Sequence, residues 1–299
     1  MWTKENIRNQ SGKTVIVTGA NTGIGYETAL AFYQAGAHVL VACRDENKAQ
    51  KAIASLNTHA GDGTLEVGVV DLASLASVKP FADHFLQHHS RLDVLINNAG
   101  VMVPPASVTN DGFELQFGVN FLGHFALTGY LYPLLKQTLN ARVVTLTSLA
   151  YRYGTIDFDN LRSEKGYDAM REYSQSKLAD LLFTIELQKR ITTAHDRILS
   201  VAAHPGVTQT DLSRNMEKTA IEAATQRLGA LMETAQGALP SLYAAVSSEV
   251  EGASLYGPDQ DGGLRGYPAK TEIDVVALNA TLAAHLWQTA ERLTGVIYP

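Results

Sequence analysis

Short apolar runs rich in β-branched residues alternate with longer segments of helical periodicity along much of the chain. The runs are too short for buried helices and are apolar at successive positions, which is typical of strands covered on both faces. The predicted strands lie at residues 14–18, 39–42, 65–70, 94–96, 143–147 and 198–202. The predicted helices lie at residues 24–35, 46–56, 75–89, 112–139 and 173–192.

This alternation predicts a parallel sheet with helices on both faces, because right-handed crossovers bring successive strands side by side. The expected fold class is therefore α/β, a Rossmann-type doubly wound sheet. No linker or repeat divides the chain, so we expect one domain over residues 1–299. Residues 151–172 and 207–235 break the alternation beyond strand ends and are expected to cover a substrate. Residues 252–299 are expected to form a closing strand, a Gly/Pro loop and a covering helix.

The first predicted strand runs into a glycine-rich turn, T-G-A-N-T-G-I-G at residues 18–25, which opens a helix. Glycines at such a turn let backbone N–H groups approach a pyrophosphate, and the helix N-terminus favours its negative charge. The spacing differs from the G-x-G-x-x-G dinucleotide pattern. An ordinary strand-to-helix turn is the alternative interpretation.

Arg44 follows the second predicted strand, at the position where a nucleotide-binding sheet selects the cofactor ribose. An acidic side chain there accepts from a free 2′-hydroxyl, whereas arginine pairs with a 2′-phosphate. Arg44 therefore favours NADP(H) over NAD(H), and Lys48 offers a second charge. The alternatives are a solvated surface arginine, or one neutralised by Asp45.

Small or polar residues follow the third and fourth predicted strands, as Asp71-Leu72 and Asn97-Asn98-Ala99-Gly100. An aspartate at a strand end is commonly a helix cap, and Asn-Ala-Gly is commonly a turn. The carboxyl ends of parallel strands meet at one edge of a sheet, so these residues are expected to face the same crevice as the glycine turn.

Tyr173 and Lys177 lie four residues apart on a predicted helix, which places the phenol and the ammonium on one face. A phenol has a pKa of about 10, and a nearby cation lowers it by favouring the phenolate. Such a tyrosine can exchange a proton with a carbonyl or alcohol oxygen as a hydride moves. Tyr167 also has a cation four residues on, Arg171, but it lies in the irregular segment before the helix, so we favour Tyr173.

Two further polar residues belong to this hypothesis. Ser148 ends the fifth predicted strand, so its hydroxyl is expected beside the cofactor, although a serine at a strand end is more often a cap. Asn120 lies within the apolar segment 117–125. A buried amide must be hydrogen-bonded, so Asn120 is either structural or part of the polar network of the site.

These motifs resemble the classical short-chain dehydrogenases/reductases, with T-G-x-x-x-G-x-G, N-N-A-G, Asn120, Ser148 and Y-x-x-x-K elements in order. The sequences A-C-R-D at 42–45, Y-S-Q-S-K-L-A at 173–179 and H-P-G at 204–206, followed by Thr210, are similar to the retinol-dehydrogenase-like branch. The resemblance covers nearly the whole chain.

The resemblance implies a catalytic tetrad of Asn120, Ser148, Tyr173 and Lys177. Tyr173 would be the acid/base, Lys177 would lower its pKa and hold the nicotinamide ribose, Ser148 would polarise the carbonyl, and Asn120 would hold a proton-relay water. The implied cofactor contacts are Gly19, Asn21, Thr22, Gly23, Ile24, Gly25, Arg44, Asp71, Leu72, Asn98, Ala99, Gly100, Tyr173, Lys177, Pro205, Gly206, Val207 and Thr210.

Two features depart from the family pattern. Tyr173 follows Ser148 by 25 residues, which is longer than usual and leaves residues 151–172 as a loop over the substrate side. Thr22 stands where NADP-preferring members often carry a basic residue.

Composition narrows the environment and the partners. The 24 basic and 30 acidic residues give a net charge of −6, with no basic cluster, so no nucleic-acid partner is expected. The single cysteine, Cys43, fits a reducing compartment, and a cytoplasmic location is expected. No apolar run approaches about 18 residues, so no membrane anchor is expected. His84 and His88 are four residues apart but lack an evident third ligand, so no metal is expected.

The expected substrate is a small hydrophobic aldehyde, ketone or alcohol, because the candidate pocket walls are largely apolar and no basic cluster awaits an acidic group. These walls are Val101, Met102, Val103, Tyr151, Tyr153, Phe158, Tyr167, Met170 and Leu212. A non-catalytic dinucleotide sensor or scaffold on the same fold is the alternative function. The sequence leaves open a homodimer or a monomer.

Overall fold

A single eight-stranded sheet forms the centre of the computed structural model, which describes residues 1–215, 226 and 229–298. The strand order is β3-β2-β1-β4-β5-β6-β7-β8. The strands are β1 (Thr14–Thr18), β2 (His38–Cys43), β3 (Thr64–Val69), β4 (Val94–Asn97), β5 (Ala141–Leu146), β6 (Ile198–Ala203), β7 (Leu255–Gln260) and β8 (Arg265–Thr271). The seven strands β1 to β7 are all parallel, and β8 runs antiparallel to β7.

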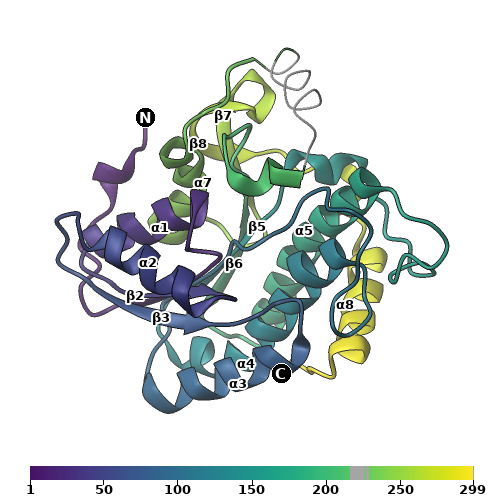
Figure 1. The fold of residues 1–299 in the computed structure, drawn as a ribbon, viewed down its shortest axis with the longest axis horizontal. Helices are drawn as coiled ribbons and strands as arrows, with labels where there is room; N and C mark the ends of the chain where they lie inside the picture. Colours follow the sequence, from purple (N-terminus) through teal and green to yellow (C-terminus); the bar gives the residue numbers. More distant parts are fainter. Residues whose placement is uncertain (216–225, 227–228, 299) are drawn as a thin grey trace.

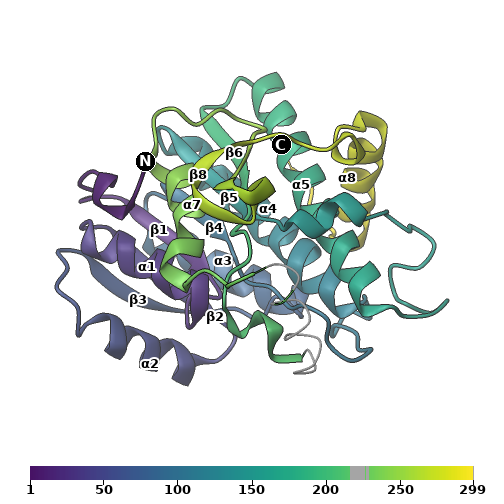
Figure 2. The ribbon, with the colours of Figure 1, turned by 90° about the horizontal axis from the view of Figure 1, so that it is seen from above.

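Helices cover both faces of this sheet, which confirms the predicted doubly wound α/β fold (Figures 1 and 2). The helices are α1 (Gly23–Gln34), α2 (Glu46–Leu56), α3 (Leu75–His88), α4 (Gly123–Gln137), α5 (Ala169–Thr193), α7 (Thr234–Val246) and α8 (Ala280–Thr294). Val15 and Val17 belong to the core shared with α1 and α7, while Ile16 belongs to the core shared with α3, α4 and α5. The alternation along β1 thus feeds two separate cores.

The sheet order creates a crevice at the carboxyl ends of β1 and β4. The chain builds outward from β1 through β2 to β3, then returns to place β4 on the other side of β1. In open α/β sheets, ligands bind outside the strand ends at this reversal. The glycine turn after β1 and the Asn-Asn-Ala-Gly segment after β4 both lie there.

The predicted long helix over residues 112–139 is interrupted. A π-helical turn, η2 (Phe117–Leu122), precedes α4 and contains Asn120. The helix predicted to begin at residue 173 instead begins at Ala169, because the Asp168 side chain caps it by accepting a hydrogen bond from the backbone N–H of Arg171.

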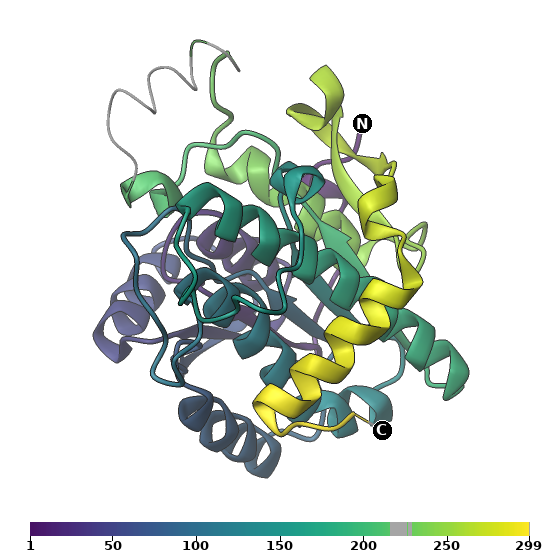
Figure 3. The ribbon, with the colours of Figure 1, turned by 90° about the vertical axis from the view of Figure 1, so that its right-hand side faces the viewer.

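The C-terminal region contains the predicted closing strand, β7, but differs from the prediction at the Gly/Pro loop. Residues 265–271 form the eighth strand rather than a loop. Pro268 is tolerated because β8 is an edge strand. The covering helix is present as α8, which packs along α5 (Figure 3).

Two expectations can be compared with the structure only over the described residues. Of the predicted covering segment 207–235, residues 216–225 and 227–228 lie outside the described residues. Within the described part of the chain, no helix combines the length and apolar character needed to cross a membrane.

Candidate active site

Thr18, the last residue of β1, joins the glycine turn to the segment after β4. Its hydroxyl oxygen accepts hydrogen bonds from the backbone N–H groups of Asn98 and Ala99, each at 2.9 Å. The Asn98 side chain donates in return to the Thr18 carbonyl at 2.6 Å. These contacts hold the two strand ends together at the crevice.

Glycine is required in this turn because backbone atoms approach closely. A Cβ on Gly19 would lie 2.9 Å from Cα of Ala99, and Gly19 has a left-handed φ of +67°. A Cβ on Gly25 would lie 2.5 Å from the Gly19 carbonyl oxygen. The glycines therefore allow the tight turn that leads into the N-terminus of α1, where backbone N–H groups can meet a pyrophosphate. The residues between these glycines that the sequence assigned to the cofactor are half-buried, namely Asn21, Thr22, Gly23 and Ile24.

The segment after β6 reaches the same turn. A Cβ on Gly23 would lie 3.8 Å from Cβ of Thr210, so these residues are neighbours. The residues that lead to Thr210, which are Pro205, Gly206 and Val207, are half-buried. The structure thus brings this predicted cofactor segment to the glycine turn.

Asp71 and Leu72 lie after β3 on the other side of the crevice. Asp71 accepts a hydrogen bond from the backbone N–H of Ala73 at 3.0 Å. Leu72 packs against the start of α4, where a Cβ on Gly123 would lie 2.7 Å from the Leu72 carbonyl oxygen. Asp71 is half-buried and Leu72 is buried.

Arg44 follows β2 with an exposed side chain. The neighbouring Asp45 caps α2, since its carboxylate accepts a hydrogen bond from the backbone N–H of Lys48 at 3.0 Å. No ion pair of Arg44 is found among the described residues. The carboxylate that was an alternative partner for Arg44 therefore has a structural task.

The amide side chain of Asn120 ties the loop after β4 to α5. Its Oδ1 accepts from the backbone N–H of Val101 at 2.8 Å, and its Nδ2 donates to the Val101 carbonyl at 3.0 Å. Nδ2 also donates to the Ser176 hydroxyl at 2.9 Å. Because both amide protons are used, the side chain is a fixed connector within the π-helical turn.

Ser148, Tyr173 and Lys177 meet at the end of β5. Lys177 Nζ donates to the Leu146 carbonyl at 2.9 Å and lies 6.0 Å from the centre of the Tyr173 ring. The Ser148 side chain lies close enough to Tyr173 to lower the pKa of its phenol. Gly100 lies next to this group, since a Cβ on it would be 4.0 Å from Lys177 Nζ and 3.3 Å from Asn120 Oδ1. The structure therefore gathers all four predicted tetrad residues.

Burial dominates the proton equilibria of this group. It raises the pKa of Tyr173 above its ordinary value, while Lys177 and the Ser148 hydroxyl act in the opposite direction. Burial also opposes the charge of Lys177, but attraction by Asp180 and Tyr173 outweighs it and raises the pKa of Lys177. At neutral pH the tyrosine is thus a neutral phenol beside an ammonium.

A family model described as short chain dehydrogenase matches residues 13–221. The chain belongs to the short-chain dehydrogenase family. It is 40% identical to retinol dehydrogenase 14 of Mus musculus over 96% of this chain and 87% of the relative. It is likewise 40% identical to retinol dehydrogenase 13 of Homo sapiens, over 96% of this chain and 86% of the relative.

Solved structures agree with this assignment. An uncharacterised protein of Mycobacterium paratuberculosis is 38% identical, with a TM-score of 0.83 over 100% of this chain and 99% of that one. The NADP active-site complex of Pseudomonas aeruginosa RhlG is 25% identical, with a TM-score of 0.67 over 83% of this chain and 94% of that one. The chain is therefore a retinol-dehydrogenase-like oxidoreductase of this family.

In this short-chain dehydrogenase, two buried residues next to the tetrad were not predicted. The first, Asp180, lies three residues after Lys177 and accepts its hydrogen bond at 2.8 Å. Burial raises the pKa of Asp180 to about 7, although Lys177 opposes the shift. The i, i+3 spacing on the helix was the available signal.

The second is His124, which connects the glycine turn to Asn120. Its Nε2 lies 2.8 Å from the Thr18 hydroxyl, and its Nδ1 lies 2.8 Å from the Asn120 carbonyl oxygen. A carbonyl only accepts, so Nδ1 carries the proton and Nε2 accepts from Thr18. Burial lowers the pKa of His124 to about 4, so the ring is neutral. The i, i+4 spacing from Asn120 was the available signal.

Tyr167, the alternative to Tyr173, lies apart from the tetrad lysine. Its hydroxyl donates to the Pro104 carbonyl at 2.6 Å. Arg171, the cation four residues on, pairs with Glu172 instead. Tyr167 therefore holds the covering loop in place.

Two other proposed pocket walls pack against the C-terminal region instead. Tyr151 is fully buried, and its hydroxyl accepts from the backbone N–H of Asp274 at 2.8 Å. Phe158 stacks on His285 of α8, with ring centres 4.0 Å apart.

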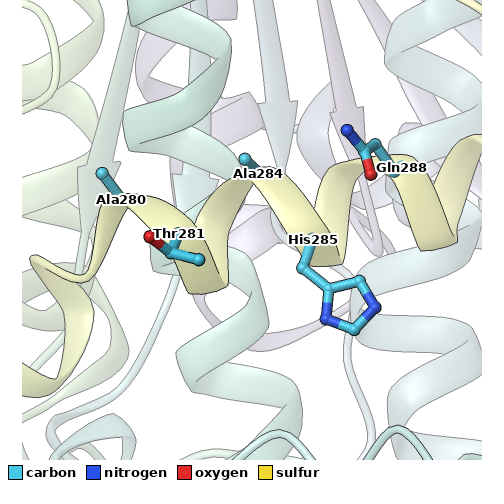
Figure 4. A pocket seen from close by; sticks show the side chains of 5 residues that line it. All are labelled: Ala280, Thr281, Ala284, His285 and Gln288. Carbon is cyan, nitrogen blue, oxygen red and sulfur yellow. The ribbon is translucent and has the colours of Figure 1, made fainter.

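Figure 4 shows His285 among the residues that line a shallow surface hollow along α8. None of the lining residues belongs to the tetrad or to the predicted cofactor contacts, so this hollow is separate from the candidate active site.

Proposed function

We propose that this oxidoreductase interconverts a small hydrophobic aldehyde or ketone and its alcohol, with NADP(H) as cofactor and Tyr173 as acid/base. The observation that carries the proposal is the convergence of Ser148, Tyr173 and Lys177 beside Asn120 and the glycine turn. The bound cofactor supplies or accepts the hydride. The residues of this chain bind the cofactor, orient the substrate and move the proton.

In the direction of reduction, Tyr173 donates its phenolic proton to the substrate oxygen. The Ser148 hydroxyl donates a second hydrogen bond to the same oxygen and polarises the carbonyl. The Lys177 ammonium stabilises the phenolate that remains. Asn120 holds the π-helical turn against α5, and the proposed relay water belongs next to this turn.

The cofactor-binding residues are proposed to be the full set assigned from sequence. The glycine turn would hold the pyrophosphate, because Gly19 and Gly25 allow the close backbone packing that forms it, where a Cβ would collide with Ala99 or with the Gly19 carbonyl. Arg44 would pair with the 2′-phosphate, since its side chain is exposed at the end of β2 and Asp45 is engaged as a helix cap. These features support NADP(H) over NAD(H).

The proposed substrate site lies between the loop after β4 and the segment after β6. Val101, Met102, Val103 and Leu212 are half-buried in these segments. The Asn215 side chain donates to the Met102 carbonyl at 3.3 Å, so the two segments touch. Apolar walls of this kind favour a hydrophobic carbonyl compound over an acidic one. Residues 151–172 and the described part of 207–235 are proposed to cover the site within a single domain.

The proposed oligomeric state is a monomer, since α8 covers α5. Trp287 is 1% exposed and stacks on Phe183 of α5, and the Tyr298 hydroxyl donates to the Phe125 carbonyl at 2.6 Å. A cytoplasmic location is proposed for a chain whose single cysteine, Cys43, is free and buried.

The decisive experiment measures NADPH and NADH oxidation with a panel of hydrophobic aldehydes and ketones, for the wild type and Tyr173→Phe. We expect NADPH-dependent turnover in the wild type, and a loss of about 100- to 10,000-fold in the variant. NADPH binding, followed by cofactor fluorescence, should be retained in the variant. Equal turnover in both proteins would refute the role of Tyr173. Cofactor binding without turnover of any compound by the wild type would favour the alternative, a dinucleotide sensor.

A further inference from the structure

Three side chains from distant parts of the sequence converge at the amino-terminal side of the sheet, around one carboxylate oxygen. Glu66 Oε2 lies 2.9 Å from His38 Nε2 and 3.4 Å from His89 Nε2. His38 begins β2, Glu66 lies on β3, and His89 follows the last residue of α3. The three ligand atoms lie within 4.8 Å of one another.

We propose that His38, Glu66 and His89 form a binding site for a divalent transition metal, with Zn²⁺ as the best fit. Zinc bonds to imidazole nitrogen and carboxylate oxygen at about 2.0–2.2 Å, so tetrahedral ligand atoms lie roughly 3.3–3.5 Å apart. The two measured separations, 2.9 and 3.4 Å, are close to that spacing. Two imidazoles and one carboxylate favour zinc over the oxygen-seeking Mg²⁺ and Ca²⁺.

One nitrogen in this cluster lacks a hydrogen-bond partner. His89 Nε2 is buried, and it accepts or donates no hydrogen bond within the described part of the chain. Its 3.4 Å approach to Glu66 is close without the geometry of a hydrogen bond. A buried polar atom without a partner destabilises the folded protein. A metal ion between the nitrogen and the carboxylate would satisfy it.

The first histidine is already oriented by a second hydrogen bond. His38 Nδ1 lies 2.6 Å from the hydroxyl of Thr64. Thr64 is the residue on β3 that is paired with His38 on β2. Without metal, His38 Nε2 donates to the Glu66 carboxylate at 2.9 Å, because a carboxylate only accepts, and Nδ1 accepts from Thr64. Metal binding would move the ring proton to Nδ1, which would then donate to Thr64, as is common in metal-bound histidines. The His38 and His89 rings are inclined by 29°, so one ring must turn for both lone pairs to reach one ion. The His38 side chain is 29% exposed, against 14% for His89, so the adjustment falls on His38 and includes its hydrogen bond to Thr64.

The site is separate from the chemistry of the crevice. β2 has six residues, and a strand rises about 3.3 Å per residue, so His38 is about 17 Å from the end that carries Arg44. An ion here would connect two strands at the edge of the sheet to the end of α3. Glu66 is 34% exposed, which leaves a fourth position for water. The expected role is structural and does not depend on the proposed reaction.

The test is zinc titration of the full-length protein after removal of metals, by calorimetry and by thermal unfolding with and without Zn²⁺. We expect one Zn²⁺ per chain and a rise in melting temperature, with Co²⁺ giving the absorption of a tetrahedral site. His89→Ala and Glu66→Gln should each weaken binding at least tenfold and abolish the rise.

The matched control is His84→Ala, a histidine of α3 whose ring packs on His88 instead. It should bind Zn²⁺ as the wild type does. Glu66→Gln preserves shape, so it tests the site even if His89→Ala is unstable. Wild-type binding no tighter than that of Glu66→Gln, or equal loss in His84→Ala, would overturn the proposal and leave an adventitious ion only.

Discussion

Lys177 Nζ lies 2.8 Å from Asp180 Oδ2, and the two side chains are only 7% and 2% exposed. The other oxygen of Asp180 is buried and has no hydrogen-bond partner within the described part of the chain. The ion pair is therefore incompletely satisfied and lies beside Tyr173. The negative charge of Asp180 offsets part of the field by which Lys177 favours the Tyr173 phenolate.

Asp180→Asn should move the pH profile of alcohol oxidation toward lower pH. The substitution keeps the shape but removes the charge that raises the pKa of Tyr173. Oxidation needs the phenolate, so the rising limb of kcat/KM should shift down by about one pH unit. The pKa of Asp180 is about 7, so Asp180 is neutral in acid and the two profiles should converge below pH 7. The measurement is kcat/KM for an alcohol across about pH 6–10.

The control for this shift is Glu186→Gln on the same helix. Glu186 is also buried, but it pairs with Lys189 and Arg190, away from Tyr173. Its profile should match the wild type. If the rising limb of kcat/KM stays at the same pH in Asp180→Asn, or moves to higher pH, Asp180 does not act on Tyr173.

Arg44→Ala should raise the KM for NADPH about 10- to 100-fold and leave the KM for NADH nearly unchanged. Hydrogen bonds to a charged group contribute about 1.5–3 kcal/mol, which corresponds to that loss. Steady-state kinetics with both cofactors provides the measurement. Lys51→Ala, an exposed cation on the following helix, is the control and should change neither KM. Equal losses for both cofactors would mean that Arg44 does not read the 2′-phosphate.

The sequence predicted the features that depend on local pattern. The turn from β1 into α1 was visible because strand, glycines and helix are contiguous. Tyr173 and Lys177 were visible because four residues on a helix bring side chains together. Periodicity also separated Tyr167 from them, since Tyr167 precedes the helix.

Features that depend on tertiary packing were not predicted. The π-helical turn at Asn120 has no periodic signature, because a single extra residue in a helical turn hardly alters the apolar pattern. β8 contains Gly266 and Pro268 and follows two further glycines, so its composition indicates a loop, and only its pairing with β7 makes it a strand. The i, i+3 spacing places Asp180 near Lys177 on the helix, but nothing in the sequence pattern shows that both side chains are buried.

Trp287→Ala should lower the free energy of unfolding by about 3–5 kcal/mol, because it leaves a large cavity between α8 and α5. Trp287 is 1% exposed and contacts Phe125, Phe183 and Tyr298. Urea unfolding at neutral pH is the measurement, with Ile297→Ala as the control, since Ile297 is 79% exposed.

Size-exclusion chromatography of the wild type should show a monomer. A wild-type dimer would contradict the proposal that α8 replaces a partner on α5.

His124→Gln should reduce the loss of stability that the wild type suffers in mild acid. Burial lowers the pKa of His124 from 6.5 to about 4, so between these values the unfolded chain binds a proton that the folded protein does not. The stability due to the neutral ring is complete above pH 6.5 and is lost as the pH falls toward 4, by on the order of 3 kcal/mol. Glutamine does not titrate, so the difference in unfolding free energy between about pH 7 and pH 4 should shrink by that amount. Urea unfolding at both values measures it, with the exposed His59→Gln as the control. An undiminished pH dependence would mean that His124 becomes charged in mild acid as readily in the folded protein as in the unfolded chain. The hydrogen bond that its Nε2 accepts from Thr18 would then be lost in mild acid.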